Sequence, residues 1–200
     1  AMLRQIPNQP ILGGKREDEA ISHTLVRYFE TGDATWPLLD PMIKSVSAGL
    51  DALQVLTKRR IGVEIRNFTL SGESKRGWAT WLTAAADHRV QALAPAVFDI
   101  LSIRDQLRHQ LASWGQYSEQ IGDYSQQGLP QMLETPAGAR LLKVIDPIAF
   151  ATHLKQPKLI ILATNDRYWP LDALNLYWPH LQGPKYAYYL PQASHDLSDK

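Results

Sequence analysis

The sequence predicts an α/β fold, in which a mostly parallel sheet is flanked by helices. Short β-prone runs occur at residues 68–70, 90–98, 157–164 and 185–190, and several segments around them carry apolar residues at helical spacing. Strands that alternate with helices are typical of a parallel sheet. Residues 157–164 are continuously apolar, as expected for a strand that is covered on both faces. These features favour one α/β domain over residues 1–200.

The composition is that of an ordinary soluble globular domain. The 200 residues are 44% hydrophobic and 20% charged, which is enough for one sizeable core. With 21 basic and 20 acidic residues, the net charge of +1 favours neither nucleic acid nor an anionic membrane as a partner. Cysteine is absent, which excludes disulfides, thiolate metal sites and cysteine nucleophiles. No apolar run approaches the roughly 18 residues of a membrane span, and the first residues lack the layout of a signal peptide.

The amino-terminal segment reads as the tail of a strand, at residues 2–6, that runs into a proline-containing loop. Nothing before it could begin a sheet, so we expect a fragment of a larger protein whose earlier strands lie upstream. Glu17, Asp18 and Glu19 then open a helix, where acidic residues suit the helix dipole and are expected to be solvated. A second helix is expected over residues 41–58, with its apolar face in the core.

Residues 100–150 differ from the rest of the chain. They contain amphipathic patterns, glutamines and the aromatic residues Trp114, Tyr117 and Tyr124, without a strand signal. An insertion of this length between two sheet strands predicts a helical cap over the pocket. After the strand at 157–164, residues 171–181 are expected to be helical.

The stretch from Phe68 to Trp78 is a strand, a tight turn of small residues and the start of a helix. Such a turn exposes one side chain at the carboxyl edge of the sheet, and Ser74 occupies that corner. Gly72 leaves room for the bend, since a Cβ there would crowd the serine. The usual hydrolase elbow is G-x-S-x-G, whereas this chain has Arg76 at the second glycine and Gly77 one place later. From these residues alone, Ser74 could equally be a helix N-cap.

A serine nucleophile requires a histidine base and a carboxylate that orients it. Ser74, Asp166 and His195 follow the order Ser, Asp, His of α/β-hydrolases, and each comes directly after a predicted strand. The other five histidines fall within or beside helices, where surface histidines are usual. Asp99, at the end of the preceding strand, is a rival acid, but the buried strand that leads to Asp166 favours the latter. Two further aspartates are expected to be a helix cap and a loop residue: Asp146 and Asp172.

The remaining site residues follow from the same arrangement. The backbone N–H of Lys75, directly after the nucleophile, is the expected oxyanion donor. A second donor normally follows an earlier strand, upstream of residue 1. Asn8 and Gln9 could line the pocket from their loop, although a turn held by proline explains them as well. Trp169, in the loop of the acid, is expected to contact substrate. No metal spacing, phosphate loop or dinucleotide fingerprint is present, so no cofactor or metal is expected.

Several short motifs together resemble the PhoPQ-activated pathogenicity-related proteins, and the resemblance covers nearly the whole chain. Arg76 is then part of the family's own pattern. The resemblance implies an α/β-hydrolase fold related to serine peptidases and esterases, in longer proteins that are usually exported to the periplasm or secreted. The motifs are Pro7-Asn8-Gln9-Pro10, Glu17-Asp18, Pro41-Met42-Ile43-Lys44, Ser71-Gly72-Glu73-Ser74-Lys75-Arg76-Gly77-Trp78, Asp87-His88-Arg89-Val90, Asp146-Pro147, Thr164-Asn165-Asp166 and His195.

The sequence therefore predicts a serine hydrolase that cleaves an ester or amide bond in a small-molecule or peptide substrate. Ser74 would attack the carbonyl, His195 would move the proton, and Asp166 would orient His195. The alternative is a non-catalytic, secreted hydrolase-fold protein that binds a partner or signals. An intact serine, acid and histidine argue against this alternative, because a pure binding protein has no need of all three.

Overall fold

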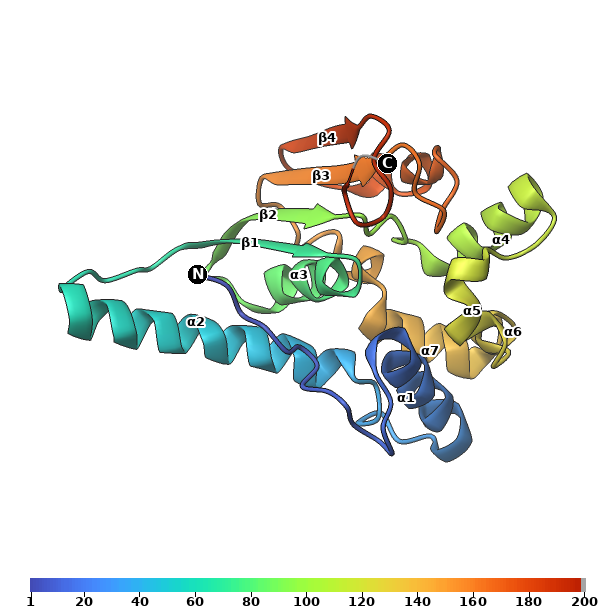
Figure 1. Cartoon of the computed structure of the whole chain (residues 1–200), viewed down its shortest axis with the longest axis horizontal. Helices are drawn as coiled ribbons and strands as arrows, with labels where there is room; N and C mark the ends of the chain where they lie inside the picture. The colour runs from blue at the N-terminus through green and yellow to red at the C-terminus, as the bar shows by residue number, and fades with distance from the viewer. Residues whose placement is uncertain (199–200) are drawn as a thin grey trace.

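A computed structural model describes residues 1–198 and shows a sheet of four parallel strands (Figure 1). The strands are β1 (Phe68–Glu73), β2 (Val90–Ala96), β3 (Lys158–Ala163) and β4 (Lys185–Leu190), and they lie side by side in that order. All three neighbouring pairs are parallel. The predicted α/β class and all four predicted strands are confirmed. Parallel pairing brings the carboxyl ends of the strands to one edge.

Two long helices precede the sheet, and a third follows β1 directly. They are α1 (Glu17–Thr31), α2 (Leu39–Ile61) and α3 (Lys75–Ala86). Helix α3 packs against β1 and β2, and α2 packs against α3 (Figure 1). Pro41 lies in the first turn of α2, where its missing N–H costs no helical hydrogen bond. None of the helices within residues 1–198 is long and apolar enough to cross a membrane.

Residues 100–150 are helical, as predicted, and form what we call the helical insertion between β2 and β3. In Figure 1 the strand arrows point toward this insertion, so it lies beyond the carboxyl edge of the sheet. The insertion comprises α4 (Ile103–Trp114), η1 (Glu119–Ile121), α5 (Gly122–Ser125), α6 (Leu129–Leu133), α7 (Pro136–Ile145) and η2 (Pro147–Phe150).

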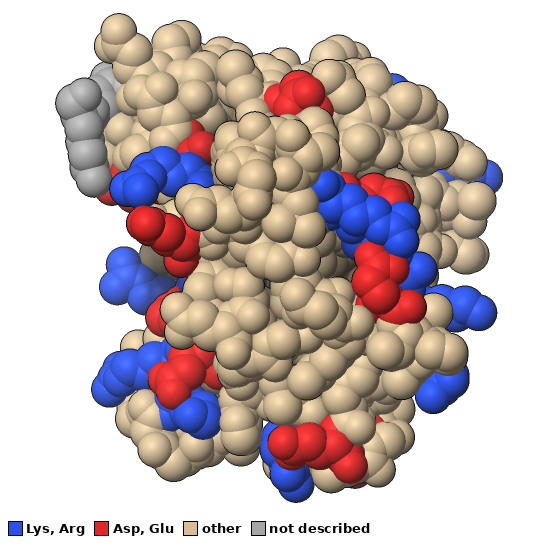
Figure 2. Space-filling model, turned by 90° about the vertical axis from the view of Figure 1, so that its right-hand side faces the viewer, with Lys and Arg blue, Asp and Glu red and all other residues tan. Residues whose placement is uncertain are grey.

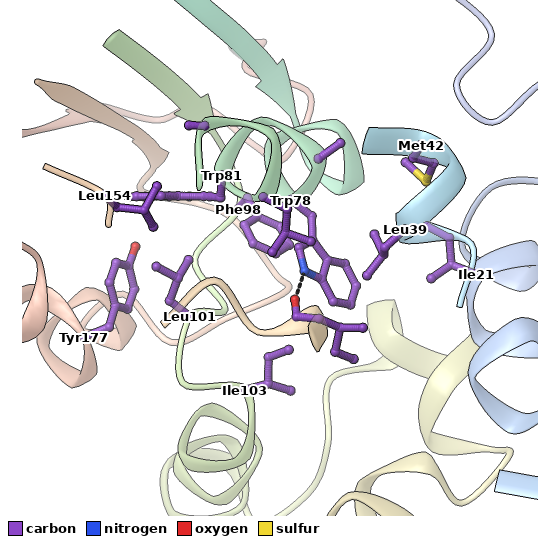
Figure 3. Close-up of a cluster of buried hydrophobic side chains, with 14 of the residues drawn as sticks. Ile21, Leu39, Met42, Trp78, Trp81, Phe98, Leu101, Ile103, Leu154 and Tyr177 are labelled. Atoms are coloured by element: carbon purple, nitrogen blue, oxygen red, sulfur yellow. Dashed lines mark hydrogen bonds between the residues drawn. The ribbon is translucent and has the colours of Figure 1, made fainter. Parts of the chain in front are cut away.

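One continuous core joins α3 to the helical insertion. Trp78 and Trp81 of α3 are buried, and the Trp78 ring stacks on Phe98 with ring centroids 5.5 Å apart. The Trp78 indole N–H also donates to the carbonyl of Ile145 at 2.5 Å, across 67 residues of sequence (Figure 3). A buried indole N–H usually has such an acceptor. This contact fixes the end of α7 against the helix that carries the elbow.

Three details differ from the sequence prediction. Residues 2–6 form no strand, because no neighbouring strand pairs with them, and Leu3 instead lies close to Gly49 of α2. Residues 171–181 form two short 3-10 helices, η3 (Ala173–Leu176) and η4 (Trp178–His180), with Pro179 at the start of the second. Helix α2 is longer than predicted and ends at Ile61, where Gly62 takes the left-handed conformation that closes many helices.

Candidate active site

Ser74 lies at the corner between β1 and α3, at the carboxyl edge of the sheet. Its backbone dihedrals are φ 53° and ψ −127°, a conformation that residues other than glycine rarely adopt. Holding a residue there costs on the order of 1–3 kcal/mol, and such strain clusters at functional sites. The serine side chain makes no capping hydrogen bond to α3. The hydroxyl therefore does not cap the helix, although an N-cap role was the other explanation that the sequence allowed for Ser74.

Gly72 and Gly77 make room for this corner, but the neighbours of Gly72 differ from those predicted. A Cβ on Gly72 would lie 2.5 Å from the carbonyl oxygen of Arg76 and 2.8 Å from Thr80 Oγ1. The clash would therefore be with the first turns of α3 and not with the serine, as the sequence had suggested. A Cβ on Gly77 would lie 2.8 Å from Phe98 Cβ. Gly77 thus lets the helix approach the sheet closely, while the Arg76 side chain extends away from the turn toward Glu17.

The structure brings His195 and Asp166 together. His195 Nδ1 lies 2.8 Å from Asp166 Oδ2, and the other carboxylate oxygen, Oδ1, accepts the Tyr168 backbone N–H at 2.9 Å. An ionised carboxylate can only accept, so Nδ1 carries the proton and Nε2 is left as the acceptor nitrogen. Nε2 is buried and has no hydrogen-bond partner among residues 1–198. Five other buried side-chain atoms within residues 1–198 also lack a hydrogen-bond partner, but His195 Nε2 is the one whose residue lines a cavity together with Ser74.

Ser74 and His195 line the same cavity, between the elbow and the helical insertion. Lys75 and Trp169 also line it. Asn8 and Gln9 are not among its lining residues: Asn8 is exposed, and the Gln9 amide binds Glu17. The expected role of these two residues in lining the pocket therefore finds no support in the shape of this cavity.

The rival acid, Asp99, has a different partner. It is buried, and Tyr177 donates its hydroxyl to Asp99 Oδ1 at 2.6 Å. Burial raises the pKa of Asp99 to about 7, with the Asp166 carboxylate adding to the rise and the Tyr177 hydrogen bond opposing it. Asp146 caps η2, as predicted, and Asp172 lies exposed in a loop and contacts His109. Of these aspartates, Asp166 is the one in contact with His195.

Sequence reasoning missed an ion-pair network behind the elbow. The Lys75 ammonium lies 2.9 Å from both Glu17 and Asp18, and Arg76 binds Glu17 through two nitrogens. The Arg76 guanidinium holds the pKa of the Glu17 carboxyl well below its usual range. The Tyr124 hydroxyl of α5 donates to Asp18 at 2.8 Å. These acids are therefore not simply a solvated helix start, since they connect the elbow to α1 and to the helical insertion.

Tyr168 and Gln110 were also missed. The Tyr168 ring stacks on the His195 imidazole, with centroids 3.9 Å apart and an interplanar angle of 27°. The buried Gln110 of α4 donates its amide to the Tyr168 carbonyl at 2.6 Å. The position of an aromatic residue two places after the acid was a signal for Tyr168, but nothing in the sequence indicated the partner of Gln110. Together they join the acid loop to the helical insertion.

Charges around the site are balanced locally. Figure 2 views the side of the molecule that carries the helical insertion, where basic and acidic side chains lie next to each other around a broad neutral area. Within residues 1–198, no group of three or more His, Cys, Asp or Glu side chains is placed to hold a metal ion.

Two hydrolases are among the solved structures that resemble this chain. Acetyl xylan esterase 1 from Thermoanaerobacterium has a TM-score of 0.59 at 19% identity, covering 92% of this chain and 55% of its own. The acylaminoacyl peptidase of Pyrococcus horikoshii has a TM-score of 0.54 at 17% identity, covering 76% and 23%. At such low identity these likenesses show the α/β-hydrolase fold, which confirms the fold predicted from the sequence.

Sequence relatives define the family. Autocrine proliferation repressor protein A of Dictyostelium discoideum is 33% identical over 203 residues, which cover 98% of this chain and 41% of that protein. The chain thus spans less than half the length of this relative. The family model for PhoPQ-activated pathogenicity-related protein matches residues 1–200. The chain therefore belongs to the PhoPQ-activated pathogenicity-related protein family.

Proposed function

We propose that this protein is a serine hydrolase that cleaves an ester or amide bond through Ser74, His195 and Asp166. The observation that carries the proposal is the buried, unpartnered His195 Nε2, which lines one cavity with the strained Ser74 while Nδ1 is held by Asp166. Histidine in this tautomer is ready to accept a serine proton. Hydrogen bonds between catalytic groups often form fully only when substrate binds.

The reaction then follows in two steps. Ser74 Oγ bonds to the substrate carbonyl carbon, and its proton passes to His195 Nε2; the bond to the leaving group breaks, and that group takes the proton from His195. Water next gives a proton to His195 and attacks the acyl carbon; the bond to Ser74 Oγ breaks, Oγ takes the proton from His195, and the acid is released. In this proposal the backbone N–H of Lys75, at the first position of α3, donates to the oxyanion.

A second candidate function is binding without catalysis. The observation that favours it is the name of the Dictyostelium relative, a repressor of proliferation, which describes a signal and not a reaction. Such a protein would use the helical insertion, our proposed cap, as its contact surface. Binding alone would require neither the strained backbone at Ser74 nor the unpartnered Nε2 of His195.

The two functions are separated by labelling the full natural protein with a fluorophosphonate, which reacts with activated serines. We expect labelling of the wild type and its loss in Ser74→Ala and in His195→Ala. Ser71→Ala is a matched control, because Ser71 lies on the same strand and bonds the Ala94 carbonyl. A folded wild type that is not labelled would favour the binding function.

Export to the periplasm or the medium belongs to the same proposal. Its support is the family to which the chain belongs, since members resembling it are usually exported. Fractionation of cells that express the full natural protein tests it: we expect the protein outside the cytoplasm. Recovery in the cytoplasmic fraction alone would contradict export and would leave the hydrolase proposal unaffected.

A further inference from the structure

The cavity beside Ser74 is lined almost entirely by apolar side chains. The helical insertion contributes Ile103, Leu107, Ile121, Leu129, Leu133 and Ile145, and these residues come from α4, η1, α6 and α7. Trp78 and Phe98 add aromatic surface from the opposite side, next to the elbow. Binding sites of this kind gain affinity from apolar surface and orient the ligand with a few polar groups.

The charged side chains in this lining, other than the proposed reacting groups, are already paired. Lys75 and Asp18, the two oppositely charged residues of the lining, lie 2.9 Å from each other. Glu17 adds a second carboxylate to Lys75, and Tyr124 adds a hydrogen bond to Asp18. A carboxylate or an ammonium group of a substrate would therefore find no unpaired counter-charge among the described residues of the lining. Burying such a charge unpaired costs several kcal/mol.

The size of the cavity limits what can enter. Its volume is about 80 Å³. A cavity that holds one water needs only roughly 10–15 Å³, so this space can take a group of several atoms. An acetyl group would leave most of that apolar space unfilled. A longer acyl chain would fill more of it.

We infer that the substrate is an ester or amide of a neutral, apolar acyl group longer than acetyl. This inference rests on the proposed function, because it places the acyl carbonyl at Ser74 and the acyl chain among the side chains of the helical insertion. Leu107 is then a residue that determines specificity. Its side chain is buried against the cavity, whereas Leu111, one turn later on α4, is 41% exposed and does not line it.

Hydrolysis of p-nitrophenyl acetate, butyrate, hexanoate, octanoate and dodecanoate by the full natural protein tests the inference. One buried methylene is worth about 0.8 kcal/mol, or about fourfold in kcat/KM. We expect hexanoate to exceed acetate by on the order of 100-fold, with a fall at dodecanoate. Leu107→Trp should move the optimum toward acetate, Leu107→Ala should move it toward longer chains, and Leu111→Trp should leave it unchanged.

A readout that needs no catalysis keeps the two proposals apart. In Ser74→Ala, we expect hexanamide to raise the thermal midpoint of unfolding at concentrations where acetamide has no effect, and Leu107→Trp to abolish that rise. Fluorophosphonate labelling with acetate as the best ester would overturn the acyl-group inference while supporting the hydrolase. Stabilisation by hexanamide without any labelling would overturn the hydrolase and leave only an apolar binding pocket. An absence of both would overturn both.

Discussion

Two aspartates end neighbouring strands of the sheet and have opposite surroundings. Asp166 follows β3, accepts a backbone N–H from Tyr168 and contacts the imidazole of His195. Asp99 follows β2, is buried, and receives the hydroxyl of Tyr177. Burial raises the pKa of Asp99 to about 7. Asp166 therefore has the partner that a catalytic acid needs, and Asp99 has that of a structural carboxyl group.

The difference shows what brings a carboxylate into contact with a histidine at the candidate site. Both aspartates reach the same edge of the sheet, since parallel strands align their carboxyl ends. What separates them is the chain that follows. After Asp166, a short loop returns the backbone N–H and the ring of Tyr168 to the acid and the imidazole. After Asp99, the chain enters the helical insertion, and the buried Tyr177 closes over the carboxyl group.

The largest effect is expected for Asp166→Asn. An amide cannot hold the His195 imidazole in the same tautomer, and a comparable change in a serine protease lowers kcat by about 10⁴-fold. We expect a loss of that order in the rate of fluorophosphonate labelling, with the fold retained in circular dichroism. A rate near that of the wild type would mean that another group orients His195, and Asp99 would then be the first residue to examine.

Asp99→Asn should affect stability and its dependence on pH. The folded pKa of Asp99, about 7, is above its ordinary value of 3.8. The folded state therefore binds the proton more tightly, and the wild type loses stability as pH rises from about 4 to 7. The asparagine variant lacks this loss. At pH 8 it should be more stable than the wild type by up to about 4 kcal/mol, from three pKa units at 1.36 kcal/mol each.

Denaturant unfolding of both proteins between pH 4.5 and 8 measures this effect. The difference between the two free energies of unfolding isolates Asp99 from other titrating groups, among them the buried Asp146, whose pKa burial raises to about 6. A difference that stays constant with pH would contradict the elevated pKa. Labelling of Asp99→Asn with the fluorophosphonate should remain close to that of the wild type, in contrast to Asp166→Asn.

Tyr168→Leu tests the ring that distinguishes the surroundings of Asp166. The Tyr168 backbone N–H to Asp166 survives the substitution, so the variant removes the ring stacked on His195 together with its hydroxyl. An aromatic face next to an imidazolium is worth about 0.5–2 kcal/mol, or roughly 2- to 30-fold in kcat. We expect that loss in kcat on p-nitrophenyl esters, and recovery in Tyr168→Phe. Equal losses in both variants would assign the effect to the hydroxyl.

The order of the elements, and with it most of the fold, could be predicted because it depends on local patterns. The sequence could suggest the three candidate residues for the same reason, because each directly follows a predicted strand: Ser74, Asp166 and His195. The choice between Asp99 and Asp166 depended on partners that lie elsewhere in the sequence. The pairing of Glu17 with Arg76 spans 59 residues, and no local pattern in a single sequence encodes it. The strand predicted at residues 2–6 was wrong, because this strand-like segment has no neighbouring strand to pair with.

The smallest effect is expected for Asp172→Asn, which removes a third carboxylate of the same region. Asp172 contacts His109 of α4 at 2.8 Å, but its side chain is 62% exposed, so water and salt screen the pair. Exposed ion pairs contribute about 0.2–1 kcal/mol. The free energy of unfolding should fall by no more than this amount, and labelling of Ser74 should not change. A large loss of labelling would show that the contact between α4 and the loop after Asp166 positions the acid, in addition to the bond from Gln110.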